Sequence, residues 1–264
     1  MVKRHFFQYG NGNIHYHHTG DGKVILLLHE MPLSSEVFLP MFPFLKDDFC
    51  IIAPDYPGFG ESSQPENPLT FKEVASLFFD MLDNFGVDSF VIYGVHGGAS
   101  LGIEMAVQQP DRVESLILSG VPLFTEEERK LFHQKLPKFL IKEDGSHLQE
   151  WWKYFEEKFK PAISKEMIHK GVQQIIKAGK NYEWGYREAF NYDPGNGLSI
   201  IQLPILLLTA NGDVLVDKNK DVLKLTNQVV HEWIVDVPGQ LSQRIPEKTS
   251  ALIKKFLNGV EVDG

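Results

Sequence analysis

The chain has 264 residues, of which 43% are hydrophobic and 23% are charged, and its formal net charge is −9. This length and this apolar content suit one large α/β domain, or such a domain with an insertion, and exclude disorder and a fibrous fold. Acidic and basic residues are scattered and form no basic stripe, so we expect neither a nucleic acid nor a membrane surface as a partner.

The single cysteine, Cys50, cannot form a disulfide within the chain. Its place in the apolar run Phe49–Ile52 predicts a buried thiol without chemistry of its own. No stretch approaches the roughly 18 apolar residues of a membrane span. Residues 1–9 indicate a first strand rather than a signal peptide, so we expect a cytoplasmic protein.

Strand and helix patterns alternate along most of the chain. The first 30 residues indicate a β-meander of three strands, the third of which is the uniformly apolar run Val24–Leu28, typical of a strand covered on both faces. Further strands are expected at 49–53, 90–93, 115–119, 205–209 and 231–236, and helices at 35–46, 71–85, 98–109, 218–228 and 246–257. This order predicts an α/β fold, with a mostly parallel central sheet and helices on both faces.

The alternation stops between residues 121 and 200, where no strand is expected. Helix starts are indicated at Thr125, Ser146 and Ser164, and ten Phe, Tyr and Trp residues lie between positions 151 and 192. We therefore predict a core of residues 1–120 and 201–264, with a helical lid at 121–200. The aromatic residues suit the wall of an apolar pocket, but they also suit simple packing of the lid onto the core.

Four motifs follow the predicted strands. They are His29-Glu30-Met31-Pro32, Asp55-Tyr56-Pro57-Gly58-Phe59-Gly60-Glu61-Ser62, Gly94-Val95-His96-Gly97-Gly98 and, after residues 205–209, Asp213. In type, order and spacing they resemble the motifs of the α/β-hydrolase superfamily, of the lidded, single-domain kind, over nearly the whole chain. The resemblance implies an oxyanion loop at the first motif, a nucleophile elbow at the third, and a triad acid at Asp213.

The residue at the tip of the elbow is His96. Small residues are needed two positions before and two after the tip, and Gly94 and Gly98 meet this need. A tip at Val95 would instead place Tyr93 where a small residue is required. The family carries a serine, cysteine or aspartate nucleophile at this place, and an acyl-imidazole is labile, so ordinary serine chemistry is not expected. A normal serine hydrolase that used Ser100 as its nucleophile is not expected either. Ser100 lies four residues further along the expected helix, away from the backbone N–H groups that bind the oxyanion in this family.

Two further residues depart from the family pattern. Gln240 stands where the resemblance places the catalytic histidine; no histidine follows His231, and glutamine cannot carry a proton near neutral pH. Glu30 replaces the glycine of the oxyanion loop, and its carboxylate would weaken anion stabilisation if it pointed inward. The resemblance implies that the backbone N–H groups of Met31 and Gly97 form the oxyanion hole.

We predict a new pair between His96 and Asp213. An imidazole is longer than a serine side chain, and the space left by the missing histidine lies between these two positions. The hydrogen bond would be direct, or would pass through Gln240 or a water molecule. Asp213 would then raise the pKa of His96 and hold one tautomer, as acid/base chemistry requires.

The remaining histidines have structural interpretations. His15 and His17 share one face of a strand, but without an evident third ligand they predict no metal site. No cofactor is expected. His29 is interpreted as structural, and Asp55 and Ser62 are expected to stabilise their loop. The lid histidines are expected in solvent, although one of them could reach the pocket as a replacement base: His133, His147 and His169.

Two functions fit the sequence. The first is an enzyme of hydrolase descent that carries out hydrolase-like or lyase-like acid/base chemistry on a small, mainly apolar carbonyl compound, through His96 and Asp213. The second is an inactive relative that binds or senses a small molecule. The retained Asp213 and elbow glycines favour the first. The sequence specifies neither the ligand nor the oligomeric state.

Overall fold

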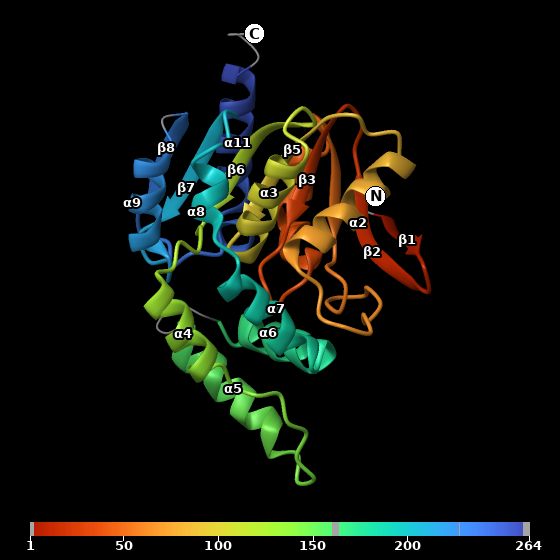
Figure 1. Ribbon diagram of the computed structural model, residues 1–264, viewed down its shortest axis with the longest axis vertical. Helices are drawn as coiled ribbons and strands as arrows, with labels where there is room; N and C mark the ends of the chain where they lie inside the picture. The colour runs from red at the N-terminus through yellow and green to blue at the C-terminus, as the bar shows by residue number, and fades with distance from the viewer. Residues whose placement is uncertain (1–2, 160–163, 227, 261–264) are drawn as a thin grey trace.

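The computed structural model describes residues 3–159, 164–226 and 228–260, and its strands form one sheet (Figure 1). The order across the sheet is β1-β2-β4-β3-β5-β6-β7-β8. β1 and β2 are antiparallel, β2 is antiparallel to β4, and the other neighbours are parallel. The strands are β1 Lys3–Tyr9, β2 Gly12–Thr19, β3 Lys23–Leu28, β4 Phe49–Pro54, β5 Phe90–Val95, β6 Val113–Ser119, β7 Ile205–Ala210 and β8 Val229–Ile234. The predicted mostly parallel sheet is confirmed.

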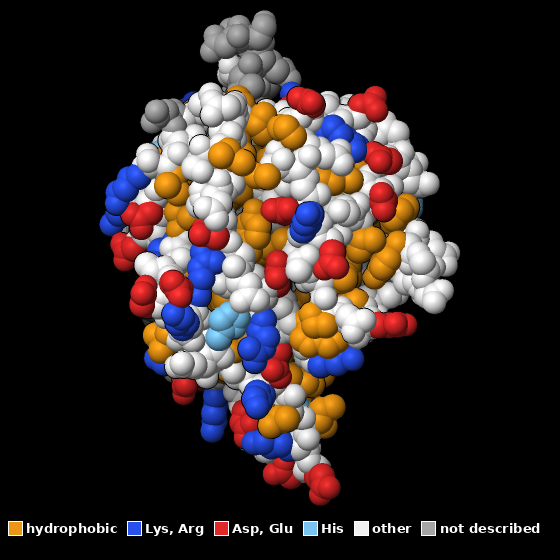
Figure 2. Space-filling view, viewed as in Figure 1, with side chains coloured by type: hydrophobic (Ala, Val, Ile, Leu, Met, Phe, Trp, Pro, Cys, Tyr) orange, Lys and Arg blue, Asp and Glu red, His pale blue; other side chains and the backbone are white. Residues whose placement is uncertain are grey.

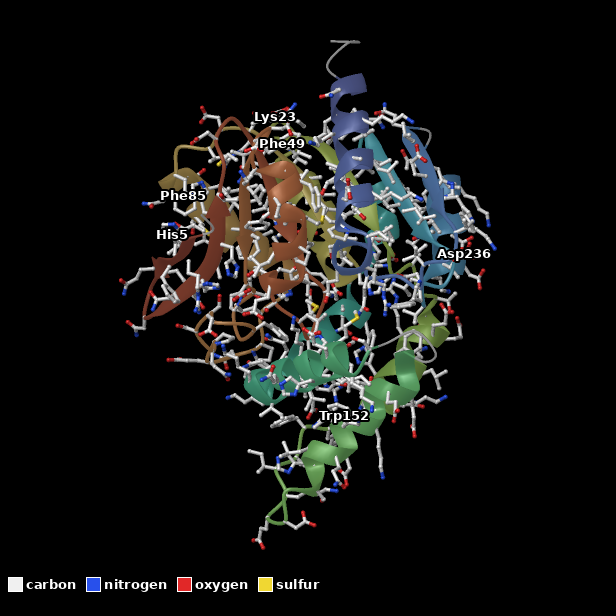
Figure 3. The ribbon with its side chains drawn as sticks, turned by 180° about the vertical axis from the view of Figure 1, so that it is seen from behind. His5, Lys23, Phe49, Phe85, Trp152 and Asp236 are labelled. Atoms are coloured by element: carbon white, nitrogen blue, oxygen red, sulfur yellow. The ribbon has the colours of Figure 1, made fainter. Side chains whose placement is uncertain are left out.

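Helices cover both faces of this sheet, as predicted. Side chains alternate along β3: Leu26 and Leu28 enter one hydrophobic cluster with α2 and α3, while Ile25 and Leu27 enter another with η1, α1 and α11. Figure 3 shows α11 running across the face that Figure 1 leaves behind the sheet. The helices of this part are η1 Ser35–Met41, α1 Phe42–Leu45, α2 Phe71–Asn84, α3 Gly97–Gln108, α9 Val216–Leu225, α10 Leu241–Arg244 and α11 Pro246–Val260.

The predicted meander is wrong at its third strand, because β4 lies between β2 and β3. β3 is buried on both faces and takes an interior place with two parallel neighbours, whereas β2 has an alternating burial pattern and pairs with the antiparallel edge strand β1. The chain makes this crossing through Gly20, whose φ is +79°. A Cβ on Gly20 would lie 2.0 Å from the carbonyl oxygen of Phe49, so this close approach requires glycine.

Other boundaries differ from the prediction for local reasons. The helix expected at 35–46 is a 3₁₀ helix, η1, followed by the short α1, because Pro40 and Pro43 supply no backbone N–H for a continuous α-helix. β8 ends at Ile234, before the predicted 236, because Asp236 turns the chain with a φ of 62°. Cys50 is half-buried rather than buried, and its Sγ lies 3.3 Å from Nε2 of His18.

Five helices lie between β6 and β7 within the described residues. The predicted starts hold: Thr125 and Ser164 cap α4 and α6, and α5 begins at Ser146. In Figure 1, α4 to α7 stand at one end of the sheet, and α8 returns the chain alongside α3. The boundaries of a lid at 121–200 stay a prediction. The five helices are α4 Glu126–Lys135, α5 Ser146–Phe159, α6 Lys165–Ala178, α7 Asn181–Asn191 and α8 Pro194–Leu198.

The surface carries both signs of charge. Figure 2 shows acidic and basic side chains interspersed over the face that it presents, with no field of a single sign. Among the described residues, no helix has both the length and the hydropathy that crossing a bilayer requires.

Candidate active site

The turn from β5 to α3 has the geometry of an elbow with His96 at its tip. His96 has a φ of 48° and a ψ of −112°, a strained conformation for a residue with a Cβ, and α3 begins at the next residue. A Cβ on Gly94 would lie 2.4 Å from the carbonyl oxygen of Gly98, and a Cβ on Gly98 would lie 2.0 Å from that of Leu28. Both glycines are therefore required, and the structure places His96, not Val95, at the tip.

The imidazole of His96 contacts Asp213 directly. Nε2 lies 3.1 Å from Oδ1 and 3.0 Å from Oδ2 of the carboxylate, although the two residues are 117 positions apart. Asp213 is buried and also accepts the backbone N–H of Leu215 at 2.8 Å. Burial raises the pKa of Asp213, but the adjacent His96 and the Leu215 amide outweigh this effect and lower it below its usual value. Because a carboxylate only accepts, Nε2 carries the proton and the lone pair of the neutral ring is on Nδ1.

Two glycines make room for this pair. Gly120, directly after β6, has a φ of +69°, and a Cβ there would lie 2.2 Å from Cδ2 and 2.5 Å from Nε2 of His96. A Cβ on Gly239 would lie 2.6 Å from Oδ2 of Asp213. The sequence analysis missed Gly120. Its only signal in the sequence is a glycine at the end of a strand, which by itself indicates no more than a turn.

Replacing Gly120 with alanine is expected to separate His96 from Asp213. The new methyl group would occupy the place of the imidazole, so a crystal structure of the variant should show the Nε2–carboxylate distance beyond about 3.5 Å, the limit of a hydrogen bond. Gly86→Ala is the matched control, because Gly86 has a φ of +68° but nothing within 4 Å of its Cβ position. Both variants should lose about 1–2 kcal/mol of stability from the left-handed backbone. An unchanged contact in Gly120→Ala would contradict this account of the pair.

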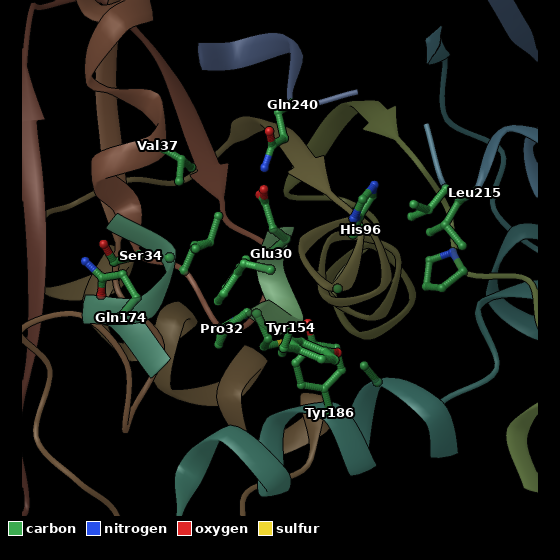
Figure 4. A pocket seen from close by; sticks show the side chains of 18 of the residues that line it. Glu30, Pro32, Ser34, Val37, His96, Tyr154, Gln174, Tyr186, Leu215 and Gln240 are labelled. Carbon is green, nitrogen blue, oxygen red and sulfur yellow. The ribbon is translucent and has the colours of Figure 1, made fainter. Parts of the chain in front are cut away.

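Glu30 is buried on the wall of the same cavity as His96. It is 7% exposed, and its Oε2 has no hydrogen-bond partner within the described part of the chain. Burial raises the pKa of Glu30 above its usual value, and the nearby His96 opposes that shift in part. Figure 4 shows Glu30 beside His96, with the side chains of Glu30 and Gln240 pointing toward one another.

His29 holds the loop that carries Glu30. Its Nε2 accepts the backbone N–H of Tyr56 at 3.1 Å, its Nδ1 donates to the carbonyl oxygen of Glu30 at 3.1 Å, and its ring stacks on Tyr56. Burial lowers the pKa of His29, which keeps the ring neutral for these two roles. The structural interpretation of His29 agrees with these contacts.

Met31 and Gly97 both line the cavity next to His96. Gly97 is the first residue of α3, where an N–H has no acceptor within the helix. A Cβ on Gly97 would lie 2.6 Å from Sδ of Met31, so the two residues are in contact. Their role as oxyanion donors stays a prediction.

Gln240 also lines the cavity, at a left-handed position with a φ of 51° just before α10. Its Oε1 accepts from Nη2 of Arg244 at 3.4 Å. Because His96 reaches Asp213 directly, the predicted bridge through Gln240 is not needed.

The cavity has a volume of about 900 Å³ and lies between the carboxyl ends of the strands and the helices of the inserted segment. Part of the aromatic set lines it: Tyr154, Phe155, Tyr186 and Phe190. Others are buried away from it, as Trp151 and Tyr182 are. Both interpretations of these residues thus apply, each to a different subset.

The remaining histidines and Ser100 lie outside the cavity. His133 contacts Asn191 at 2.8 Å, and neither it nor His147 nor His169 lines the cavity, so the structure gives none of them the place of a replacement base. Ser100 is fully buried within α3. Among the described residues, no group of three His, Cys, Asp or Glu side chains is placed to hold a metal ion.

A buried polar network contains His15 and His17. Asp55 accepts Nδ1–H of His15 at 2.8 Å, the Ser35 N–H at 2.7 Å and hydroxyl at 2.6 Å, and the Glu61 N–H at 2.8 Å. The Ser35 hydroxyl in turn accepts Nδ1–H of His17 at 2.9 Å. Ser62 donates to the Asp55 carbonyl, so Asp55 and Ser62 do stabilise their loop. Burial lowers the pKa of His17 to about 4, helped by the neighbouring His15.

A family model of the alpha/beta hydrolase fold matches residues 23–240, and the chain therefore belongs to the α/β-hydrolase family. A solved structure of a thermophilic esterase from Thermogutta terrifontis superposes with a TM-score of 0.78 at 21% identity, over 98% of this chain and 99% of the esterase. This likeness shows the fold alone.

Two curated relatives match over shorter stretches. Haloalkane dehalogenase 2 of Mycobacterium tuberculosis is 33% identical over 116 residues, which are 44% of this chain and 41% of the dehalogenase. An uncharacterized hydrolase of Saccharomyces cerevisiae is 34% identical over 103 residues, which are 39% of this chain and 36% of that hydrolase. The chain thus spans less than half the length of either relative.

Proposed function

We propose that this protein performs acid/base chemistry of a hydrolase or lyase type on a small, mainly apolar carbonyl compound. The observation that carries the proposal is the direct contact between His96 Nε2 and the Asp213 carboxylate on the wall of a cavity of about 900 Å³. A cavity of this size suits a small molecule. Relatives named as a hydrolase and a haloalkane dehalogenase, both matching in part, support a small-molecule substrate.

In this proposal His96 is the acid/base group and Asp213 its partner. The carboxylate holds the Nε2–H tautomer and stabilises the imidazolium that forms when Nδ1 takes a proton. The N–H groups of Met31 and Gly97 would bind the carbonyl oxygen, and the N-terminus of α3 favours negative charge at that place. Residues 121–200 would act as a lid, since Tyr154, Phe155 and Tyr186 wall the cavity against water.

The second candidate function is small-molecule binding or sensing without turnover. It is favoured because the family's nucleophile and base are both replaced at their usual positions. The tip of the elbow carries no hydroxyl, thiol or carboxylate, Ser100 is buried outside the cavity, and Gln240 cannot accept a proton near neutral pH.

The test compares the wild-type protein with His96→Ala on short-chain activated esters and on uncharged ketones. We expect the variant to lose about 10²–10⁴-fold in turnover, the usual contribution of a general acid or base. His169→Ala is the control, because His169 is an exposed imidazole outside the cavity. We expect no labelling by a fluorophosphonate probe, because no serine stands at the tip. Equal turnover in His96→Ala would contradict the proposal, whereas no turnover together with ligand-dependent thermal stabilisation would favour the binding protein.

A further inference from the structure

Glu30 is as buried as a core residue, yet it lies on the wall of the cavity. A buried carboxyl group normally accepts or donates hydrogen bonds with each oxygen, because an unsatisfied polar atom away from water costs free energy. Oε2 of Glu30 has no such bond within the described residues, although the side chain is 93% buried, since 7% of it is exposed. An atom of a ligand in the cavity would supply the missing partner.

Burial, and to a smaller extent the neighbouring charges, set the protonation of Glu30. Four titratable groups face it: the imidazole of His96, the carboxylate of Asp213, and the phenols of Tyr56 and Tyr93, both of which are buried and without a hydrogen-bond partner among the described residues. His96 is already paired with Asp213, so a second carboxylate would add an unpaired negative charge to an apolar cavity. Burial raises the pKa of Glu30 and Asp213 adds a smaller increase, while His96 opposes these two effects in part.

We propose that Glu30 is a second acid/base group of this site, a neutral carboxylic acid whose O–H donates to the carbonyl oxygen of the ligand. This inference rests on the proposed function, in which His96 is the base, and it names the substrate class and the reaction. The substrate is an uncharged, mainly apolar ketone with a C–H group next to its carbonyl, because an anionic ligand beside His96 would be repelled by the ionised Asp213 and would lose hydration in a mainly apolar cavity. The reaction is proton transfer at that carbon.

The step balances in atoms and charge. Nδ1 of His96 takes the proton from the carbon next to the carbonyl, and the electron pair of that C–H bond forms a carbon–carbon double bond. The π pair of the carbonyl moves to its oxygen, which takes the proton of Glu30. An enol, an imidazolium and a carboxylate result, and the reverse step restores the ketone and both residues. The neutral acid thus does for the carbonyl oxygen what backbone N–H groups alone cannot do, since they donate a hydrogen bond but do not give up the proton.

The experiment measures exchange of protons for deuterium in 4-phenyl-2-butanone, dissolved in D₂O with the full chain and followed by ¹H NMR. We expect wild-type protein to catalyse exchange at the positions next to the carbonyl, and Glu30→Gln to be slower by about 10²–10⁴-fold, because an amide donates a hydrogen bond but does not transfer its proton. Glu66→Gln is the matched control, since Glu66 is exposed to solvent and does not line the cavity. Its exchange rate should equal that of the wild type.

Two measurements without substrate accompany it. Infrared spectra at neutral pH should show the C=O band of a protonated carboxylic acid in wild type and Glu66→Gln but not in Glu30→Gln. Thermal melts should show Glu30→Gln more stable than wild type at neutral pH. Because the pKa of Glu30 is raised in the folded protein, the wild type loses stability as the pH rises above 4.5, the usual value. Glu30→Gln does not lose this stability, so its advantage should vanish below pH 4.5.

The outcomes separate this inference from the proposed function. Exchange that depends on His96 but is equally fast in Glu30→Gln would overturn the role of Glu30 and leave the proposed function standing. Absence of the infrared band in the wild type would overturn the neutral acid. Absence of both exchange and any other turnover that depends on His96 would defeat the proposed function itself.

Discussion

Asp213→Asn is expected to reduce turnover that depends on His96 by about 10²–10⁴-fold while leaving the fold intact. The amide oxygen of asparagine can still accept the Nε2 proton of His96, but it carries no charge to stabilise the imidazolium that forms during proton transfer. The wild-type carboxylate lies 3.0 Å and 3.1 Å from Nε2 and is buried, so little solvent screens the charge that the variant removes. Steady-state kinetics on the ester and ketone substrates give the measurement.

The control for this variant is Asp217→Asn. Asp217 lies on α9, four residues after Asp213, but its carboxylate is exposed and pairs with Lys220. Its removal should leave turnover unchanged. If Asp213→Asn keeps wild-type turnover while His96→Ala does not, His96 acts without its carboxylate partner and the pair is structural.

The second large effect concerns stability. Asp55→Ala is expected to lower the free energy of unfolding by about 3–5 kcal/mol, the usual cost of removing one partner from a buried charged network. The substitution leaves three buried groups without their acceptor: the His15 ring N–H, and the backbone N–H and the hydroxyl of Ser35. Urea unfolding followed by circular dichroism measures the loss. The control is Asp47→Ala, which removes an exposed carboxylate two positions before β4, the strand that Asp55 follows. It should change stability by no more than about 0.5 kcal/mol.

The pH dependence of stability should show the contribution of the Asp55 carboxylate. Burial raises the pKa of Asp55, but the hydrogen bonds from His15, Ser35 and Glu61 outweigh it and lower the pKa from 3.8 to about 2. A lowered pKa means that the stabilisation is complete above the unfolded value and is lost as pH falls from about 4 to about 2. Wild type should lose this part of its stability within that window, and Asp55→Ala should not. Parallel acid unfolding curves for the two proteins would contradict the network.

The sequence predicted the elements because their causes are local. The uniformly apolar run of β3, the capping residues Thr125 and Ser164, and Gly94, which approaches Gly98, each depend on neighbours within a few residues. The errors came from contacts between distant segments and from overlooked local detail. The insertion of β4 beside β3 depends on which strand is buried on both faces, and Pro40 and Pro43 broke a helix that its hydrophobic pattern favoured.

For the site, the sequence by itself determined that an imidazole stands at the tip of the elbow, that Asp213 follows β7, and that no histidine follows His231. Only the tertiary structure decided that the predicted contact between His96 and Asp213 is direct, because it needs space that Gly120 and Gly239 leave from two other segments. The burial of Glu30 on the wall of the cavity was likewise visible only in the tertiary structure. Residue types and turns are set by neighbours along the chain, whereas distances between side chains and their burial are set by the packing of segments far apart in it.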